Sequence, residues 1–149
     1  MKKIEYLKEI EKLILSKDFK GAEILALEVL PKYEDALIYY FLGICQIELK
    51  KTELSIYHLK KSIFLDDKLL ILNARFVLGN IYITIKKFDL AENVLRELIA
   101  INDKEEKYFL SFINTLIHQN RSVELKRELE RALGKFPNSK DLNKLKAYL

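Results

Sequence analysis

The sequence predicts an all-α protein built from about four tandem helical hairpins and closed by a C-terminal capping helix. Its 149 residues suit one compact domain with a hydrophobic core of its own. Only 4 glycines and 2 prolines are present, so few residues interrupt helices. The pair Leu42-Gly43 recurs 36 residues later as Leu78-Gly79, which indicates an internal repeat.

The repeat extends well beyond this pair. At the same offset, Tyr39, Lys50, Lys51, Ser55 and Leu59 correspond to Arg75, Lys86, Lys87, Ala91 and Leu95. Ala91 and Leu95 correspond in turn to Leu125 and Leu129, at a spacing of 34 residues. Upstream, Phe19-Lys20-Gly21-Ala22 begins a helix in the register of Phe88-Asp89-Leu90-Ala91. The chain therefore holds four copies of one unit.

Each copy has the pattern of two amphipathic helices. Apolar residues recur every three or four positions, as in Leu37, Tyr40, Phe41 and Ile44, and again in Leu54, Tyr57, Leu59 and Ile63. Stacked hairpins bury such stripes against their neighbours and leave a concave surface. Gly43 and Gly79 fall in mid-helix, where glycine costs about 1 kcal/mol relative to alanine. We expect the paired helix to approach closely at both glycines.

Capping residues mark where helices begin. Asp35 is placed to cap the first helix of the second copy. After Pro137, Ser139 can start a last helix, whose Leu142, Leu145 and Leu149 would cover the open end of the stack.

The period and its residues resemble the tetratricopeptide repeat (TPR) family, in which Leu-Gly lies between aromatic positions on the first helix and small residues recur on the second. The resemblance implies a right-handed α-α superhelix forming a single domain over residues 1–149. Its approximate repeats are 3–34, 36–69, 72–105 and 106–139, with a capping helix over 140–149. The chain departs from the pattern in lacking Trp and in placing Ile10 and Ile113 where the family has Gly. Segments 62–67 and 76–80 also resemble the TPR segment of CheR-type chemotaxis methyltransferases, over about two repeats.

In the TPR family, fixed positions of the first helices line a concave groove that binds other proteins. Carried over in this register, the groove would be lined by Leu37, Tyr40, Ile44, Ile47, Asn73, Phe76, Asn80, Ile83, Lys107, Leu110, Asn114 and Ile117. Such a groove is apolar, with aromatic anchors and two asparagines that could bond a peptide backbone. The expected function is that of a non-catalytic adaptor or scaffold that binds an apolar or amphipathic segment of another protein.

The sequence leaves two alternatives open. The exposed apolar stripe could instead join two copies of the chain in a homodimer. The net charge of +4 could also indicate nucleic-acid binding along a lysine-rich edge formed by Lys50, Lys51, Lys86 and Lys87. Only five of the 26 basic residues are arginines, which bind phosphates and bases best, so nucleic acid is the weaker of the two.

The residues that carry catalysis or metal binding are scattered. The four glycines are isolated, so no phosphate-binding loop is expected. His58, His118 and Cys45 lie apart in the pattern, and we predict no metal site, no cofactor and no catalytic residue. A single cysteine cannot form an internal disulfide, which favours the cytoplasm. No stretch reaches the ~18 apolar residues of a membrane span.

Overall fold

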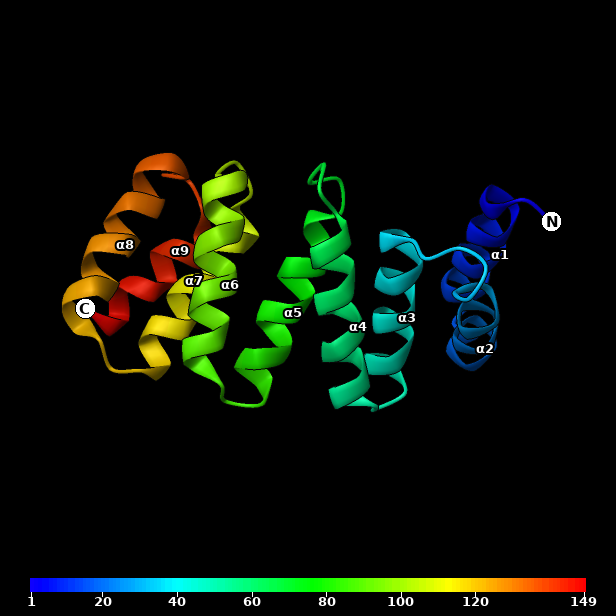
Figure 1. Cartoon of the computed structure of the whole chain (residues 1–149). Helices are drawn as coiled ribbons and strands as arrows, with labels where there is room; N and C mark the ends of the chain where they lie inside the picture. The colour runs from blue at the N-terminus through cyan, green and yellow to red at the C-terminus, as the bar shows by residue number, and fades with distance from the viewer. The chain divides into compact units, whose positions relative to one another are not determined.

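The computed structural model describes all residues, 1–149, and contains helices but no strand (Figure 1). The helices are α1 (Lys3–Leu15), α2 (Phe19–Val29), α3 (Ala36–Glu48), α4 (Thr52–Leu65), α5 (Leu72–Thr84), α6 (Phe88–Ile101), α7 (Glu106–His118), α8 (Ser122–Lys135) and α9 (Lys140–Lys144), followed by the 3₁₀ helix η1 (Leu145–Tyr148). The predicted all-α class, with four helical hairpins and a C-terminal cap, is confirmed. None of the helices combines the length and apolar character needed to cross a membrane.

The chain divides into two compact units, and each is described by itself. Unit 1 is Met1–Arg75 and contains α1 to α4 with the first residues of α5. Unit 2 is Phe76–Leu149 and contains the rest of α5 and all later helices. The single domain expected over 1–149 stays a prediction.

The core of unit 1 follows the predicted apolar stripes. α1 packs on α2 and α3, α2 packs on α3, and α3 packs on α4. Their inward faces bring together the buried residues Ile10, Ala22, Ala26, Val29, Ile38, Leu42 and Cys45. In unit 2, α7 packs on α6 and α8, and its Phe109, Phe112, Ile113 and Leu116 are buried. Burial of apolar surface at helical spacing therefore holds each unit together.

The two mid-helix glycines mark close approaches between paired helices, as the sequence predicted. A Cβ atom built on Gly43 of α3 would lie 2.6 Å from Cγ of Leu59 on α4. A Cβ atom on Gly79 of α5 would lie 2.9 Å from Cδ2 of Leu95 on α6. Ser55 adds a hydrogen bond at the first crossing, since its hydroxyl donates to the carbonyl oxygen of Gly43 at 2.7 Å. At both crossings, therefore, a leucine side chain of the second helix packs directly against a glycine of the first.

The turn inside each hairpin contains a non-glycine residue in the left-handed conformation. These residues are Lys17, Lys50 and Lys86, each with a φ of 63°, and Asn120 with a φ of 54°. The amide after the turn residue closes the first helix: Lys51 N donates to the Gln46 carbonyl and Lys87 N to the Tyr82 carbonyl, both at 2.8 Å. This is the Schellman ending, which normally has glycine at the left-handed position.

Replacing Lys86 with glycine is expected to raise the free energy of unfolding by up to about 1 kcal/mol. Glycine removes the contact between Cβ and the following carbonyl that makes this conformation unfavourable. Urea unfolding followed by far-UV circular dichroism measures the change. Lys86→Ala is the control, because it removes the same charge but keeps Cβ. An equal gain in both variants would contradict the explanation.

The two predicted N-capping residues make their hydrogen bonds, but the C-terminal capping helix differs from the prediction. Asp35 accepts a hydrogen bond from the Leu37 amide at 2.8 Å, and Ser139 accepts one from the Leu142 amide at 3.1 Å. Leu142 is fully buried, as expected, but Leu149 is 58% exposed. The prediction that Leu149 covers the open end is wrong, because α9 ends at Lys144 and η1 continues with three residues per turn.

Candidate functional site

Unit 1 has an open hollow of about 500 Å³ between α1 and α3, the first helices of its two hairpins. It is lined by Ile4, Leu7, Lys8 and Glu11 of α1, by Leu37, Tyr40 and Phe41 of α3, and by Leu70, Ile71, Leu72 and Asn73 where the chain enters α5. We call this the α1–α3 hollow. Its lining is mainly apolar, and the exposed side chains of Lys8 and Glu11 supply one charge of each sign.

Helical spacing explains why these residues share one surface. The lining positions of α1 are separated by three, one and three residues, which places them on one face of the helix. Ile10 lies off that face and is fully buried. On α3, Leu37, Tyr40 and Phe41 line the hollow, while Ile38 and Leu42 are buried. Each helix thus supplies the core with one stripe and the hollow with another.

An ion pair joins the two helices that form the hollow. Lys3 Nζ of α1 lies 2.8 Å from Oδ2 of Asp35, the cap of α3. Burial opposes ionisation of Asp35, but hydrogen bonds from Lys3 and the Leu37 amide outweigh it and hold the pKa of this carboxyl below its ordinary value. The charged cap therefore fixes the start of α3, and its ion pair with Lys3 adds a solvent-exposed contact to α1.

The apolar segment after α4 is held by Asp66. This buried residue ends α4, and its carboxylate accepts hydrogen bonds from the Leu70 amide at 2.9 Å and the Ile71 amide at 2.7 Å. Two backbone donors of an irregular segment are satisfied in this way. As a result, the segment has a defined path, along which Leu70, Ile71 and Leu72 line the hollow.

Tyr40 and Asn73 form the main polar contact of the lining. The Asn73 side-chain amide donates to the Tyr40 hydroxyl at 2.5 Å, and the Tyr40 ring lies 5.8 Å from the Phe41 ring between centroids. Asn73 is exposed. Its amide oxygen and second amide hydrogen make no hydrogen bond within the chain, so they are available to a ligand.

The predicted groove residues of unit 1 divide into two groups. Leu37, Tyr40 and Asn73 line the α1–α3 hollow. Ile44 and Ile47 are partly exposed further along α3 and do not line it. The sequence reasoning missed the contributions of α1 and of Leu70 to Leu72. The available signal was the unbroken apolar run Leu69-Leu70-Ile71-Leu72, which spans the junction between the predicted repeats 36–69 and 72–105.

The predicted groove residues of unit 2 lie on α5 and α7, and all are partly or fully exposed. They are Phe76, Asn80, Ile83, Lys107, Leu110, Asn114 and Ile117. The Phe76 ring lies 5.2 Å from the Tyr108 ring, with the Lys107 ammonium 5.2 Å above Phe76. Asn80 accepts a hydrogen bond from the Ser111 hydroxyl at 2.8 Å, so one of its two polar groups is already used. Asn114 makes no such bond.

Comparison with solved structures identifies the fold. A crystal structure of MamA superimposes with a TM-score of 0.81 at 19% identity, over 89% of this chain and 77% of MamA. YrrB, described as a TPR protein with an unusual peptide-binding site, gives 0.81 at 15% identity, over 95% of this chain and 72% of YrrB. The chain has the tetratricopeptide-repeat fold.

A larger protein contains the same TPR arrangement as one part. The Cut9-Hcn1 hetero-tetramer structure matches with a TM-score of 0.80 at 16% identity, over 98% of this chain and 29% of that chain. No protein-family model matches the sequence, and no curated protein matches it. At these identities the likeness establishes the TPR fold and nothing further.

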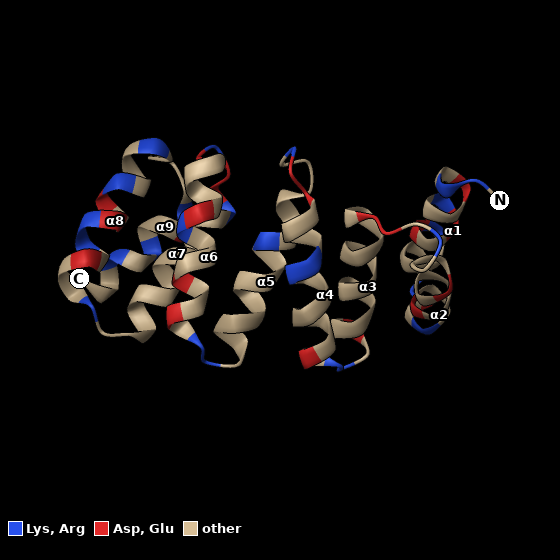
Figure 2. Cartoon of the chain, in the orientation of Figure 1, with Lys and Arg blue, Asp and Glu red and all other residues tan.

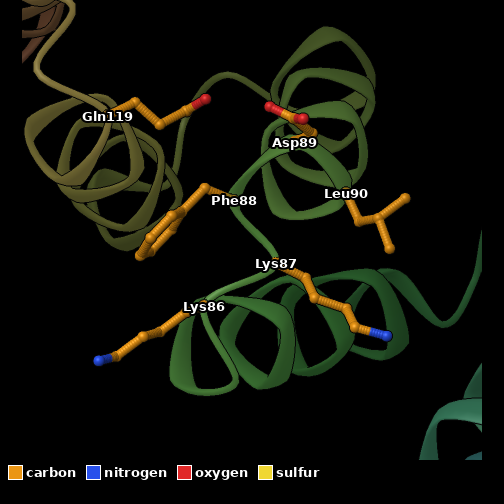
Figure 3. A pocket seen from close by; sticks show the side chains of 6 residues that line it. All are labelled: Lys86, Lys87, Phe88, Asp89, Leu90 and Gln119. Carbon is orange, nitrogen blue, oxygen red and sulfur yellow. The ribbon is translucent and has the colours of Figure 1, made fainter.

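A second, smaller hollow of about 330 Å³ lies at the turn between α5 and α6 in unit 2. It is lined by Lys86, Lys87, Phe88, Asp89, Leu90 and Gln119, and Figure 3 shows the two lysine side chains pointing away from each other. The Phe88 ring stacks on His118 of α7 at 5.0 Å between centroids. In unit 1, Lys51 is paired with Glu23 at 2.6 Å. Lys86 and Lys87 therefore do not converge on a common anion, and Lys51 is already engaged by a carboxylate.

The remaining reactive side chains serve packing. His58 is buried, with Nδ1 2.6 Å from the Gln46 side-chain oxygen, and burial lowers the pKa of its ring. Burial raises the pKa of the Cys45 thiol to about 12, which leaves it as a neutral thiol. No group of three or more His, Cys, Asp or Glu side chains is placed to hold a metal ion.

Proposed function

We propose that the chain is a non-catalytic protein-interaction module that binds an apolar or amphipathic segment of another protein in the α1–α3 hollow. The observation that carries the proposal is an open, mainly apolar surface on first helices, with Lys8 and Glu11 among its lining residues. Exposed apolar surface is unfavourable for a soluble protein unless a partner covers it. A TPR protein described with a peptide-binding site, YrrB, supports the proposal by example.

The dimensions and chemistry of the hollow suit side chains of a peptide. About 500 Å³ falls within the range of about 300–1,000 Å³ typical of ligand sites, which is enough for a few apolar side chains. Tyr40 supplies a large ring with few rotatable bonds, the usual anchor of a binding surface. The unused amide groups of Asn73 can bond the backbone of the bound segment. An amphipathic helix or a short extended segment meets these requirements.

The predicted residues of unit 2 are proposed as a second contact surface. Phe76, Lys107 and Asn114 offer, in that order, an aromatic ring, a cation and a free amide. Leu110, Ile83, Ile117 and Asn80 complete this part of the prediction. We also propose the cytoplasm as the location, since the single, buried Cys45 suits a reducing compartment.

Replacing Tyr40 with alanine is expected to weaken binding of peptides to the hollow by about 30-fold or more, the effect of losing about 2 kcal/mol at a binding hot spot. Peptides are first selected from a displayed library of random 16-residue sequences with the wild-type chain. Fluorescence anisotropy then gives the dissociation constant of each selected peptide for wild type and variant. The selected sequences should be rich in apolar residues at helical or alternating spacing.

Leu27→Ala is the matched control, because Leu27 is exposed on α2 and does not line the hollow. It should leave the dissociation constants unchanged. Circular dichroism confirms that both variants keep their helices. The proposal is wrong if folded Tyr40→Ala binds the selected peptides as tightly as wild type, or if the selected peptides are acidic and lack apolar residues.

A further inference from the structure

α4 carries an exposed apolar and aromatic stripe on a surface separate from the α1–α3 hollow. Its residues are Glu53, Ile56, Tyr57, Lys60, Lys61 and Phe64, which together line an open hollow of about 530 Å³. We call them the α4 stripe. The Phe64 side chain is 82% exposed and the Tyr57 side chain is 56% exposed. No residue of the stripe lines the α1–α3 hollow.

The repeat itself does not require apolar residues at these positions. In the register that pairs Leu59 with Leu95 and Leu129, Tyr57 corresponds to Asn93 on α6 and Arg127 on α8. Phe64 corresponds to Ala100 and Gly134. The equivalent places on the second helices of unit 2 are thus polar or small. Two large exposed rings on α4 indicate a surface that is covered by something else.

Two of the three charges of the α4 stripe, those of Glu53 and Lys61, are placed symmetrically about Tyr57, and the third, that of Lys60, has no acidic counterpart. Glu53 lies four residues before Tyr57 and Lys61 lies four residues after it, each about 6 Å along the helix axis. Figure 2 shows the acidic residue in the first turn of α4 and the basic residues further along. Neither Glu53 nor Lys61 forms an ion pair within the chain. The Lys61 ammonium lies 6.0 Å from the Tyr57 ring.

We propose that the α4 stripe is the contact surface for a second copy of this chain, with the two α4 helices antiparallel about a two-fold axis beside Tyr57. In such a pair, a residue a given distance before the axis faces one the same distance after it. Glu53 of each copy then faces Lys61 of the other, which forms two equivalent ion pairs. The two Tyr57 rings meet at the axis, and their contact removes apolar surface from water.

Charge complementarity selects a second copy over an unrelated partner. One helix face presents both members of the ion pair, in the order that antiparallel pairing needs, so the surface is complementary to itself. The contact is small: a 14-residue helix is about 21 Å long and offers well under the ~800 Å² per partner of a stable complex. The expected dissociation constant is therefore about 10–1,000 µM.

Sedimentation equilibrium of the full chain at concentrations up to about 1 mM tests the proposal. Wild type should show a monomer–dimer equilibrium. Glu53→Lys and Lys61→Glu should each weaken it about tenfold or more, because each variant opposes like charges at both contacts. An equimolar mixture of the two variants should dimerise more strongly than either alone. In the mixed dimer each substituted residue faces the opposite charge, and the unchanged Lys61 of one copy faces the unchanged Glu53 of the other.

Matched controls separate this contact from general charge effects. Glu130→Lys and Lys126→Glu make the same charge changes at exposed positions of α8, and they should leave dimerisation unchanged. Tyr40→Ala, which alters the α1–α3 hollow, should leave it unchanged as well. A wild type that stays monomeric at 1 mM, or a mixture that associates no more than its components, would overturn the proposal.

Discussion

Replacing Leu59 with alanine is expected to lower the free energy of unfolding by about 2–5 kcal/mol, the range for a large buried residue cut to alanine. Leu59 is fully buried and lies against Gly43, where α3 and α4 cross. Its loss leaves a cavity at the crossing of the two helices. Urea unfolding followed by far-UV circular dichroism measures the loss, since the chain has no tryptophan to report by fluorescence.

A double-mutant cycle with Gly43→Ala tests whether this contact is the reason for the glycine. In the wild type, the added methyl meets Leu59 at 2.6 and 2.8 Å, so the overpacking of about 1–3 kcal/mol outweighs the helix propensity of about 1 kcal/mol that alanine gains. In the Leu59→Ala background that clash is gone, and Gly43→Ala should be neutral or stabilising. Gly134→Ala is the control, because nothing lies within 4 Å of its Cβ position. Equal effects of Gly43→Ala in both backgrounds would contradict the explanation.

Replacing Arg121 with methionine is expected to lower the free energy of unfolding by about 2 kcal/mol at neutral pH, the usual effect of removing a hydrogen bond to a buried charge. Arg121 donates to Glu92 of α6 and Glu124 of α8. The Glu92 side chain is only 11% exposed and also accepts from Arg96 at 3.0 Å and Gln119 at 3.4 Å. Methionine keeps most of the aliphatic length, so the change reports mainly the charge.

The effect of Arg121→Met should shrink in acid. Burial favours the neutral form of Glu92, but hydrogen bonds from Arg121, Arg96 and Gln119 outweigh it and lower the pKa of this carboxyl. A carboxyl whose pKa is lower in the folded chain stabilises the fold at pH values above its pKa in the unfolded chain, about 4.3 for glutamate. That stabilisation is lost as the pH falls through the pKa of the folded chain. Urea unfolding at pH 7 and pH 3 gives the comparison. Arg127→Met, at an exposed guanidinium 3.7 Å from Glu128, is the control and should change stability by less than about 0.5 kcal/mol at either pH.

Much of the fold could be predicted because the same helix–helix contacts recur in successive copies of the repeat. The spacing of Leu42-Gly43 and Leu78-Gly79 predicted the hairpins, and the mid-helix glycines predicted the close crossings with Leu59 and Leu95. Local chemistry also placed the caps at Asp35 and Ser139, since each cap bonds a backbone amide only two or three residues further along the chain. The failure at Leu149 came from a helix that changes its pitch, which apolar spacing does not reveal.

The candidate site was less accessible to sequence reasoning. Register on the first helices was enough to select Leu37, Tyr40 and Asn73, which line the α1–α3 hollow. It could not select Leu70 and Ile71, because their position depends on the buried carboxylate of Asp66 and not on any helical period. The partners of Glu92 were hidden for a similar reason, since Arg121 lies 29 residues further along the chain.

The sequence by itself determined which segments are helices, how they pair and which stripe of each helix is buried, because these features follow from local spacing of apolar residues. Only the tertiary structure decided which exposed stripes come together as a surface. Side chains of α1, α3 and the segment before α5 meet in one hollow through contacts between residues distant in sequence. On α4, by contrast, Tyr57 and Phe64 stay exposed. Periodicity specifies a face of a helix, but packing specifies what that face meets.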